Sequence, residues 1–244
     1  MSAVWQIYRR ELGGYLVTPL MAVFLLLFLV LAGVMTFVVG GFYERGQADL
    51  QPFFESVPWL FLLLGPALGM RMWAEERRSG SLELLFSLPL RSSQVVAGKF
   101  LAAWTCAALA LVLTMPIWLI VNYLGRPDNG VIAVGYLGSL VLAGLYLAIG
   151  SAASALTRSQ PMAFTVAAAI CLALLLAGYP PLHDAIAVAF GAAVADAAAE
   201  LGVGDRFAAI ARGVLVARDV VYFLSGMLAG LVASWLALEL GRGD

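Results

Sequence analysis

The stretch AEERRSGSLELLFSLPLR, residues 74–91, is a charge-dense interruption in a chain that is 63% hydrophobic and only 12% charged. Within it, Ser79 and Gly80 are predicted to begin a short helix that Pro89 ends. Glu83 falls in the first turn, where a negative charge suits the positive end of the helix dipole. Apolar side chains cover most of this helix: Leu82, Leu84, Leu85, Phe86 and Leu88. We expect it to lie flat against a membrane, either as an ordinary connector between two spans or as a lever on which a separate protein pushes.

The composition of the whole chain is that of a polytopic membrane protein. Its mean hydropathy is +0.96, and Lys99 is the single lysine among 244 residues. The net charge of -1 provides no basic patch for nucleic acid. Cys106 and Cys171 each lie in an uncharged run, so we expect packing or lipid contact and no disulfide or metal site. The first apolar run is too long for the core of a cleavable signal peptide.

The chain is predicted to form one transmembrane domain over residues 1–244. Residues 1–16 have the helical spacing of an amphipathic helix in the headgroup region. Six apolar runs are long enough to span a membrane: residues 18–41, 57–73, 99–123, 131–156, 161–178 and 220–238. Residues 179–218, between the last two spans, are predicted to form interfacial helices, one of them over 185–199. Pro66 and Pro116 are expected to kink their spans because proline lacks the backbone N–H of the helical hydrogen bond.

Small residues recur at a spacing of four on two of the predicted spans. Gly135, Ser139 and Ala143 form such a stripe on the fourth span, and this stripe would let another helix approach closely. On the fifth span, Ala163, Ala167 and Cys171 form one stripe and are candidates for packing between subunits. A second small stripe on that span is Ala169, Ala173 and Ala177.

The distribution of basic residues predicts the orientation. Six spans place both termini on one side, and nine basic residues fall on that side against five on the other: Arg9, Arg10, Arg71, Arg77, Arg78, Arg91, Lys99, Arg158 and Arg242 against Arg45, Arg126, Arg206, Arg212 and Arg218. The positive-inside rule therefore favours cytosolic termini and a cytosolic segment 74–91.

The sequence offers no chemistry of its own. His183 stands beside Asp184 without a nucleophile elbow or metal-ligand spacing, and no phosphate-binding loop is present, because Phe100 follows Lys99 where Ser or Thr is needed. The chain is therefore not expected to hydrolyse ATP. Every charged residue is predicted at or beyond a span end, which disfavours an ion-coupled carrier and suggests a neutral route for an amphipathic cargo.

Three segments carry a resemblance to a known family: YRRELGGYLVTPL at 8–20, EERRSGSLELLFSLPLRSSQVVAGKF at 75–100, and FAAIARGVLVARDVVYFLSG at 207–226. They resemble the ABC-2 type permeases, and most closely the gliding-motility-associated and nitrous-oxide-reductase-maturation permeases. The resemblance implies an all-α membrane fold like that of type V exporters. In it, six transmembrane helices follow an N-terminal interfacial helix, and a cytosolic coupling helix lies between helices 2 and 3.

The resemblance also implies partners and a place. It implies a multi-pass protein of the bacterial inner membrane that pairs with a second permease copy or a paralogue. Two separate ATPase subunits would carry ATP and Mg²⁺, with no cofactor on this chain. Gly80, Leu82, Glu83, Leu85 and Pro89 match the family's coupling-helix pattern, with Ser81 where threonine is common. The transported substrate does not carry over from the family.

Two functional hypotheses follow. In the first, the chain is the permease subunit of an ATP-driven exporter. In the second, it is a non-transporting anchor or relay that passes ATPase motion to an extracytoplasmic partner. Both use the same predicted ATPase interface: Glu75, Glu76, Arg77, Arg78, Gly80, Leu82, Glu83, Leu85, Phe86 and Pro89.

Overall fold

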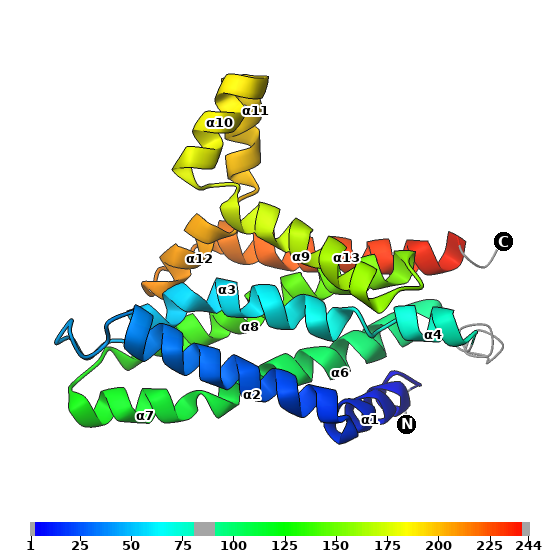
Figure 1. The fold of residues 1–244 in the computed structure, drawn as a ribbon, viewed down its shortest axis with the longest axis horizontal. Helices are drawn as coiled ribbons and strands as arrows, with labels where there is room; N and C mark the ends of the chain where they lie inside the picture. Colours follow the sequence, from blue (N-terminus) through cyan, green and yellow to red (C-terminus); the bar gives the residue numbers. More distant parts are fainter. Residues whose placement is uncertain (1–2, 81–90, 241–244) are drawn as a thin grey trace.

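A computed structural model describes residues 3–80 and 91–240, and within these ranges the regular structure is entirely helical (Figure 1). The first half contains α1 (Ala3–Val17), α2 (Pro19–Gly33), the π-helix η1 (Val34–Val39), α3 (Gln51–Gly69), α4 (Ala74–Ser79), α6 (Ser92–Leu113) and α7 (Met115–Leu124). The second half contains α8 (Asn129–Leu156), α9 (Gln160–Leu176), α10 (Pro180–Phe190), α11 (Ala192–Glu200), α12 (Gly204–Ala211) and α13 (Ala217–Leu240).

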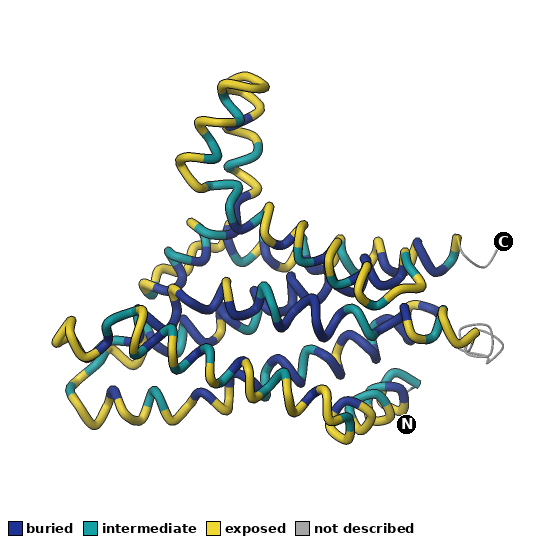
Figure 2. Tube along the Cα trace, viewed as in Figure 1, coloured by how far each residue is buried: buried dark blue, intermediate teal, exposed yellow. Residues whose placement is uncertain are grey.

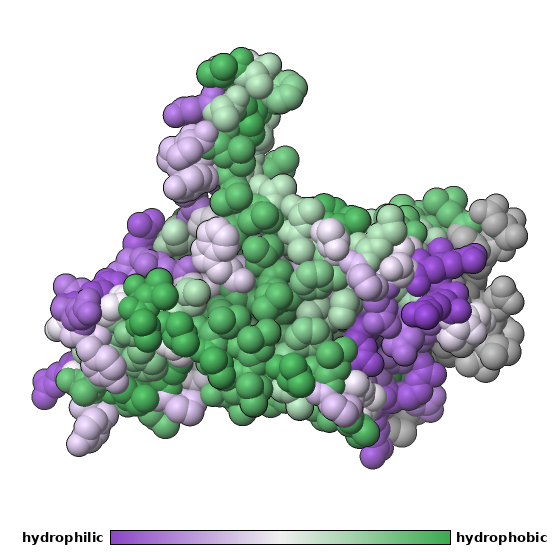
Figure 3. Space-filling view, in the orientation of Figure 1, coloured by the Kyte–Doolittle hydropathy of each residue, from purple (hydrophilic) through white to green (hydrophobic). Residues whose placement is uncertain are grey.

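The long helices run side by side along the longest axis of the molecule, and both termini lie at the same end, beside α1 and α4 (Figure 1). An apolar belt covers the middle of the bundle, and polar side chains gather at its two ends (Figure 3). Within the described ranges, five helical segments are long and apolar enough to cross a membrane. A sixth span results if α9 and α10 count as one, although the chain bends by 96° between them. The fold is therefore that of an all-α membrane protein with five or six spans.

Helix α8 lies at the centre of the bundle and packs against α3, α6, α9, α12 and α13. Its glycines permit close contacts: a Cβ at Gly69 of α3 would stand 2.6 Å from the Cα of Gly150. Nearer the start of α8, the stripe of Gly135, Ser139 and Ala143 is buried, and Gly135 lies against the ring of Phe54. Small residues thus let the backbones of these spans approach, as expected for helices packed in lipid.

Two helices begin earlier than the sequence predicts. Helix α3 begins at Gln51 rather than near residue 57, and α6 begins at Ser92 rather than Lys99. Apolar runs mark the lipid-embedded part of a span, whereas a helix continues into polar sequence wherever its side chains find partners.

The prolines of the spans lie in different settings. Helix α3 continues without a break through Pro66. In the third span the interruption falls at Thr114, between α6 and α7, and Pro116 lies in the first turn of α7. Proline is tolerated in a first turn because the N–H that it lacks would have no helical partner there.

The segment after α9 differs from the prediction of one interfacial helix over residues 185–199. The chain breaks at Gly191, whose φ of +93° is open to glycine and strained for other residues. Helices α10 and α11 on either side of Gly191 pack against each other and project from the bundle as an arm (Figures 1 and 2). No residue of α10 is buried, and Val188 is 90% exposed. The imidazole Nε2 of His183 lies 3.0 Å from Oδ1 of Asp196 and joins the two helices of the arm.

Helix α12 returns the chain from the arm to the bundle by burying Phe207 and Ile210. The guanidinium of Arg206 donates to Oδ1 of Asp219 at 2.8 Å, and Asp219 is a buried residue at the start of α13. Arg206 also donates to the carbonyl of Glu200, the last residue of α11. The base of the arm is therefore fastened to α13 by a buried ion pair.

Candidate coupling site

Helix α4 is the element on which the segment 74–91 meets the bundle. Glu75 and Glu76 lie in its first turn and Arg77 and Arg78 in its last, the arrangement that complements a helix dipole. Gly80 follows with a φ of +71°, the left-handed conformation that ends helices. Ser79 and Gly80 thus end α4, and the start of the helix predicted after them falls outside the described residues. The remainder of the predicted coupling helix, including Leu82, Glu83, Leu85, Phe86 and Pro89, lies outside the described residues.

Lys99 is the centre of a buried charge cluster beneath α4. This lysine lies in the second turn of α6 and is 3% exposed. Its ammonium donates to Oε1 of Glu76 at 2.7 Å and to Oε2 of Glu11 of α1 at 3.3 Å. The same ammonium lies 5.1 Å from the ring centroid of Trp73. A buried ammonium requires such partners because its removal from water is costly. Lys99 therefore ties α1, α4 and α6 together.

Two other residues of α4 reach other helices. Glu75 accepts a hydrogen bond from Nε2 of Gln160 at the start of α9, and Arg77 donates to the carbonyl of Ala237 near the end of α13. These bonds are 3.3 and 3.1 Å long. Together with Lys99, they connect a six-residue helix to four other helices of the chain.

The end of α3 that leads into α4 is held by serine hydroxyls. Oγ of Ser151 accepts from the indole Nε1 of Trp73 at 3.0 Å and also bonds to Ser234 of α13. Oγ of Ser154 accepts from the backbone N–H groups of Trp73 and Ala74. The turn between α3 and α4 is thus fixed to α8, and a displacement of α4 would be passed to the centre of the bundle.

Two buried polar atoms of α4 have no hydrogen-bond partner within the described ranges. They are Oε2 of Glu76 and Nε of Arg77. Burial would raise the pKa of Glu11, but the nearby Lys99 ammonium and Arg10 guanidinium outweigh it and hold the pKa below its ordinary value. Glu11 therefore remains a carboxylate partner for Lys99 at neutral pH.

Three residues of the predicted ATPase interface also have partners within the chain. Glu75, Glu76 and Arg77 bond to other helices of the bundle, and both Glu75 and Arg78 are exposed. Glu76 is already paired with Lys99, so its charge is compensated within the chain. The ATPase interface as a whole stays a prediction. Sequence reasoning missed Lys99, although a lone lysine at the start of an apolar run was a usable signal.

The predicted subunit contact on the fifth span is also wrong. Ala163, Ala167 and Cys171 are 0% exposed because α9 packs this face against α8 and α3. Ala169 and Ala173, on the other small stripe, are exposed. Small residues attract a neighbouring helix, and here the neighbour belongs to the same chain.

In the described part of the chain, no group of three or more His, Cys, Asp or Glu side chains could hold a metal ion. His183 lies on the exposed arm with Asp196 and Asp184 as its neighbours. This arrangement offers no nucleophile and supports a structural bond between α10 and α11.

The family comparison agrees with this architecture. The model of the ABC-2 family transporter protein matches residues 52–190, more than half of the chain. The chain belongs to the ABC-2 transporter family. No curated protein matches the chain. The matched range runs from α3 to the end of α10 and includes α4, Lys99 and the central helix α8. As a member of this family, the chain is a membrane permease component of an ABC transporter; the closer resemblance to particular permeases stays a prediction.

Proposed function

We propose that this ABC-2 permease is the membrane subunit of an exporter driven by separate ATPase subunits that dock on Arg78 and the segment after it. ATP and Mg²⁺ would be bound by those subunits alone. A second copy of the chain or a paralogue would complete the complex in the bacterial inner membrane, with both termini in the cytosol. Closure of the ATPases would push on α4, and the contacts of α4 would carry that motion into the spans.

The buried ion pair between Lys99 and Glu76 carries this proposal. Exposed ion pairs contribute little and break easily, whereas a pair that is 2.7 Å long and removed from water holds its two helices in one geometry. A push on α4 would therefore move α6 and α1 with it. Glu75 and Arg77 extend the same connection to α9 and α13.

A docking experiment tests where the ATPase binds. Phe86→Ala is expected to weaken recovery of the ATPase with the purified permease, by about 1 to 3 kcal/mol of association if Phe86 fills a groove in the partner. Phe190→Ala is the matched control, since Phe190 is 73% exposed on the arm, away from α4. Glu83→Arg should also weaken recovery, compared with Glu44→Arg in the loop between η1 and α3. Equal recovery with Phe86→Ala and Phe190→Ala would contradict docking on this segment.

The exposed arm favours a second candidate function, that of a relay to an extracytoplasmic partner. Helices α10 and α11 project from the bundle with Val188 and Phe190 exposed, and such a surface suits contact with another protein. Reconstitution of the permease with its ATPase in liposomes separates the candidates. Movement of an added amphiphile that requires ATP supports the exporter. ATPase activity that responds only to an added extracytoplasmic protein, with no movement, supports the relay.

The orientation is tested by cysteine labelling in intact cells. Cys106 and Cys171 are both buried, so introduced cysteines should dominate the signal. Gly130→Cys and Asp196→Cys should react with an impermeant reagent from outside, and Ser79→Cys only after the membrane is opened. Labelling of residues 130 and 196 from opposite sides would contradict the proposed topology.

A further inference from the structure

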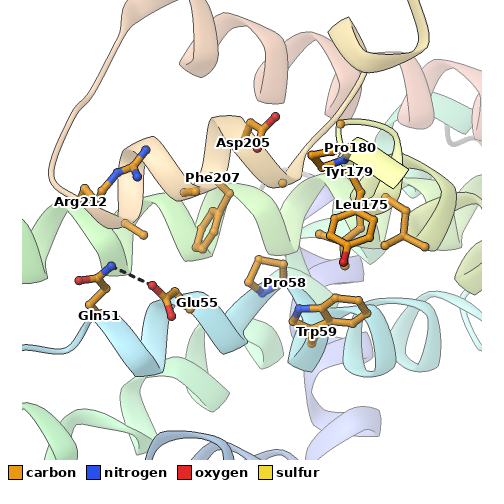
Figure 4. Close-up of a pocket in the computed structure, with 15 residues that line it drawn as sticks. Gln51, Glu55, Pro58, Trp59, Leu175, Tyr179, Pro180, Asp205, Phe207 and Arg212 are labelled. Atoms are coloured by element: carbon orange, nitrogen blue, oxygen red, sulfur yellow. Dashed lines mark hydrogen bonds between the residues drawn. The ribbon is translucent and has the colours of Figure 1, made fainter. Parts of the chain in front are cut away.

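A second candidate site lies at the end of the bundle away from the termini. A cavity of about 250 Å³ opens between α3, α12 and the junction of α9 with α10 (Figure 4). It stands apart from the Lys99 cluster, and neither the coupling contacts nor the docking proposal uses it. Its size falls below that of pockets for whole drug-sized ligands, which begin at roughly 300 Å³. It is thus suited to one end of a larger molecule.

The wall of the cavity is apolar. Phe207 projects from α12 toward α3, and Pro58 of α3 lies opposite it (Figure 4). Both residues are buried. Leu175 at the end of α9 continues this wall. The interior would therefore accept hydrocarbon or the uncharged part of a ligand.

The rim of the cavity is charged. Glu55 comes from α3, whereas Asp205 and Arg212 lie at the two ends of α12 (Figure 4). In the described part of the chain, the side chains of Asp205 and Arg212 make no hydrogen bond or ion pair. Glu55 accepts one hydrogen bond, from Nε2 of Gln51 at 2.8 Å. The Asp205 side chain points away from Glu55 and α3 (Figure 4), so the rim offers the Glu55 carboxylate and the Arg212 guanidinium, a pair that matches a group carrying both charges.

Two aromatic residues fix the depth of the cavity in the membrane. Trp59 and Tyr179 line it and are 51% and 57% exposed. Tryptophan and tyrosine favour the boundary between the lipid tails and the headgroups. Along α3, the polar residues Gln51 and Glu55 lie on the side of Trp59 nearer the end of the bundle. The rim therefore stands at headgroup level, with the aromatic side chains below it.

We propose that this cavity binds the headgroup of a zwitterionic phospholipid from the surrounding leaflet. The phosphate would pair with Arg212, since a guanidinium presents two parallel donors to phosphate oxygens. The amine would pair with Glu55, while the glycerol end would contact the apolar wall. Anionic lipids lack the amine and would leave the Glu55 carboxylate uncompensated. In the orientation proposed above, the leaflet is the outer one.

Native mass spectrometry of the purified full-length permease tests the proposal. The protein is released from micelles that contain equal amounts of phosphatidylethanolamine and phosphatidylglycerol with the same acyl chains. The wild type is expected to retain phosphatidylethanolamine in roughly tenfold excess, the discrimination expected of one charge-assisted hydrogen bond. Arg212→Gln and Glu55→Gln should each remove most of this excess. Arg126→Gln and Glu44→Gln, which make the same charge changes outside the cavity, should preserve it.

Three results would overturn the proposal: equal retention of the two lipids by the wild type, preference for phosphatidylglycerol, or an unchanged preference in both cavity variants. Glycerophosphoethanolamine, which has no acyl chains, distinguishes a lipid from a soluble ligand. Displacement of the lipid by an equal concentration of it would contradict a membrane source. All variants change exposed side chains, and equal unfolding temperatures would establish that they fold. The assay contains no ATPase, so its outcome is independent of the exporter proposal.

Discussion

Replacement of Lys99 by methionine tests the buried cluster most directly. Methionine keeps most of the length of the side chain and removes the charge, so Glu11 and Glu76 lose their shared partner while the packing around α6 changes little. Removal of one member of a buried pair costs roughly 3 to 5 kcal/mol. The two carboxylates retain 19% and 20% side-chain exposure, which lets water replace part of the lost interaction. We therefore expect a loss near the lower limit, about 3 kcal/mol.

The assay is reversible unfolding in mixed micelles, followed by tryptophan fluorescence. Arg126→Met is the matched control, because Arg126 is exposed and should change stability by about 0.5 kcal/mol or less. The double variant Lys99→Met with Glu76→Gln removes both charges and should recover part of the loss, with a coupling of about 1 to 3 kcal/mol. An unfolding midpoint for Lys99→Met equal to that of Arg126→Met would refute the reasoning. In the complete complex, Lys99→Met should also lower the response of ATPase activity to cargo.

Three further predictions test other contacts. Arg206→Ala is expected to destabilise the protein by about 3 kcal/mol, because it leaves Asp219, whose side chain is 7% exposed, without its 2.8 Å partner. Arg218→Ala, the control, should cost less than about 1 kcal/mol. Equal losses of stability in the same unfolding assay would contradict this prediction. Tyr146→Phe should leave stability unchanged or raise it, since the buried hydroxyl of Tyr146 has no hydrogen-bond partner among the described residues. Tyr136→Phe should lower the free energy of unfolding by about 1 kcal/mol, because it removes the hydrogen bond to Thr114. The hydrogen bond that the protonated His183 ring donates to Asp196, opposed by partial desolvation and aided by Asp184, raises the pKa of His183. The charged form of the bond across the arm is therefore fully present below about pH 6.5 and is lost as the pH rises through the raised pKa. An NMR titration of this single histidine should give a lower pKa in Asp196→Asn, and an unchanged value would exclude the bond.

The pH effect on the arm has a defined sign. A histidine whose pKa is raised in the folded state binds a proton more tightly there than in the unfolded chain, so protonation stabilises the fold. Hydrogen exchange of α10 and α11, corrected for the intrinsic rate, should therefore quicken as the pH rises through the raised pKa of His183. Asp196→Asn should reduce this dependence.

Much of the fold could be predicted because hydropathy is a property of consecutive residues. Long apolar runs indicated the spans, and the charges between them indicated the exposed segments. The π-helix at Val34–Val39 and the break at Gly191 left no comparable signal. A glycine in an alanine-rich segment is compatible with a continuous helix, and the contact of α10 with α11 selects the hairpin.

The candidate coupling site could be located in the sequence, but its contacts could not. The segment 74–91 stood out by its charge, and the absence of a nucleotide site directed attention to its surface. The roles of Glu75, Glu76 and Arg77 depend on Gln160, Lys99 and Ala237, which lie 85, 23 and 160 residues away. Sequence patterns along one helix do not report partners at such separations.

The sequence alone determined the class of the protein and the approximate positions of its spans, because both depend on residue type and local spacing. The tertiary structure decided which faces are used. Two stripes of small residues on α9 looked equivalent in the sequence, yet one is fully buried against α8 and α3 while Ala169 and Ala173 of the other are exposed. The physical reason is that spacing defines a stripe, whereas the crossing of helices distant in the chain determines which stripe is covered.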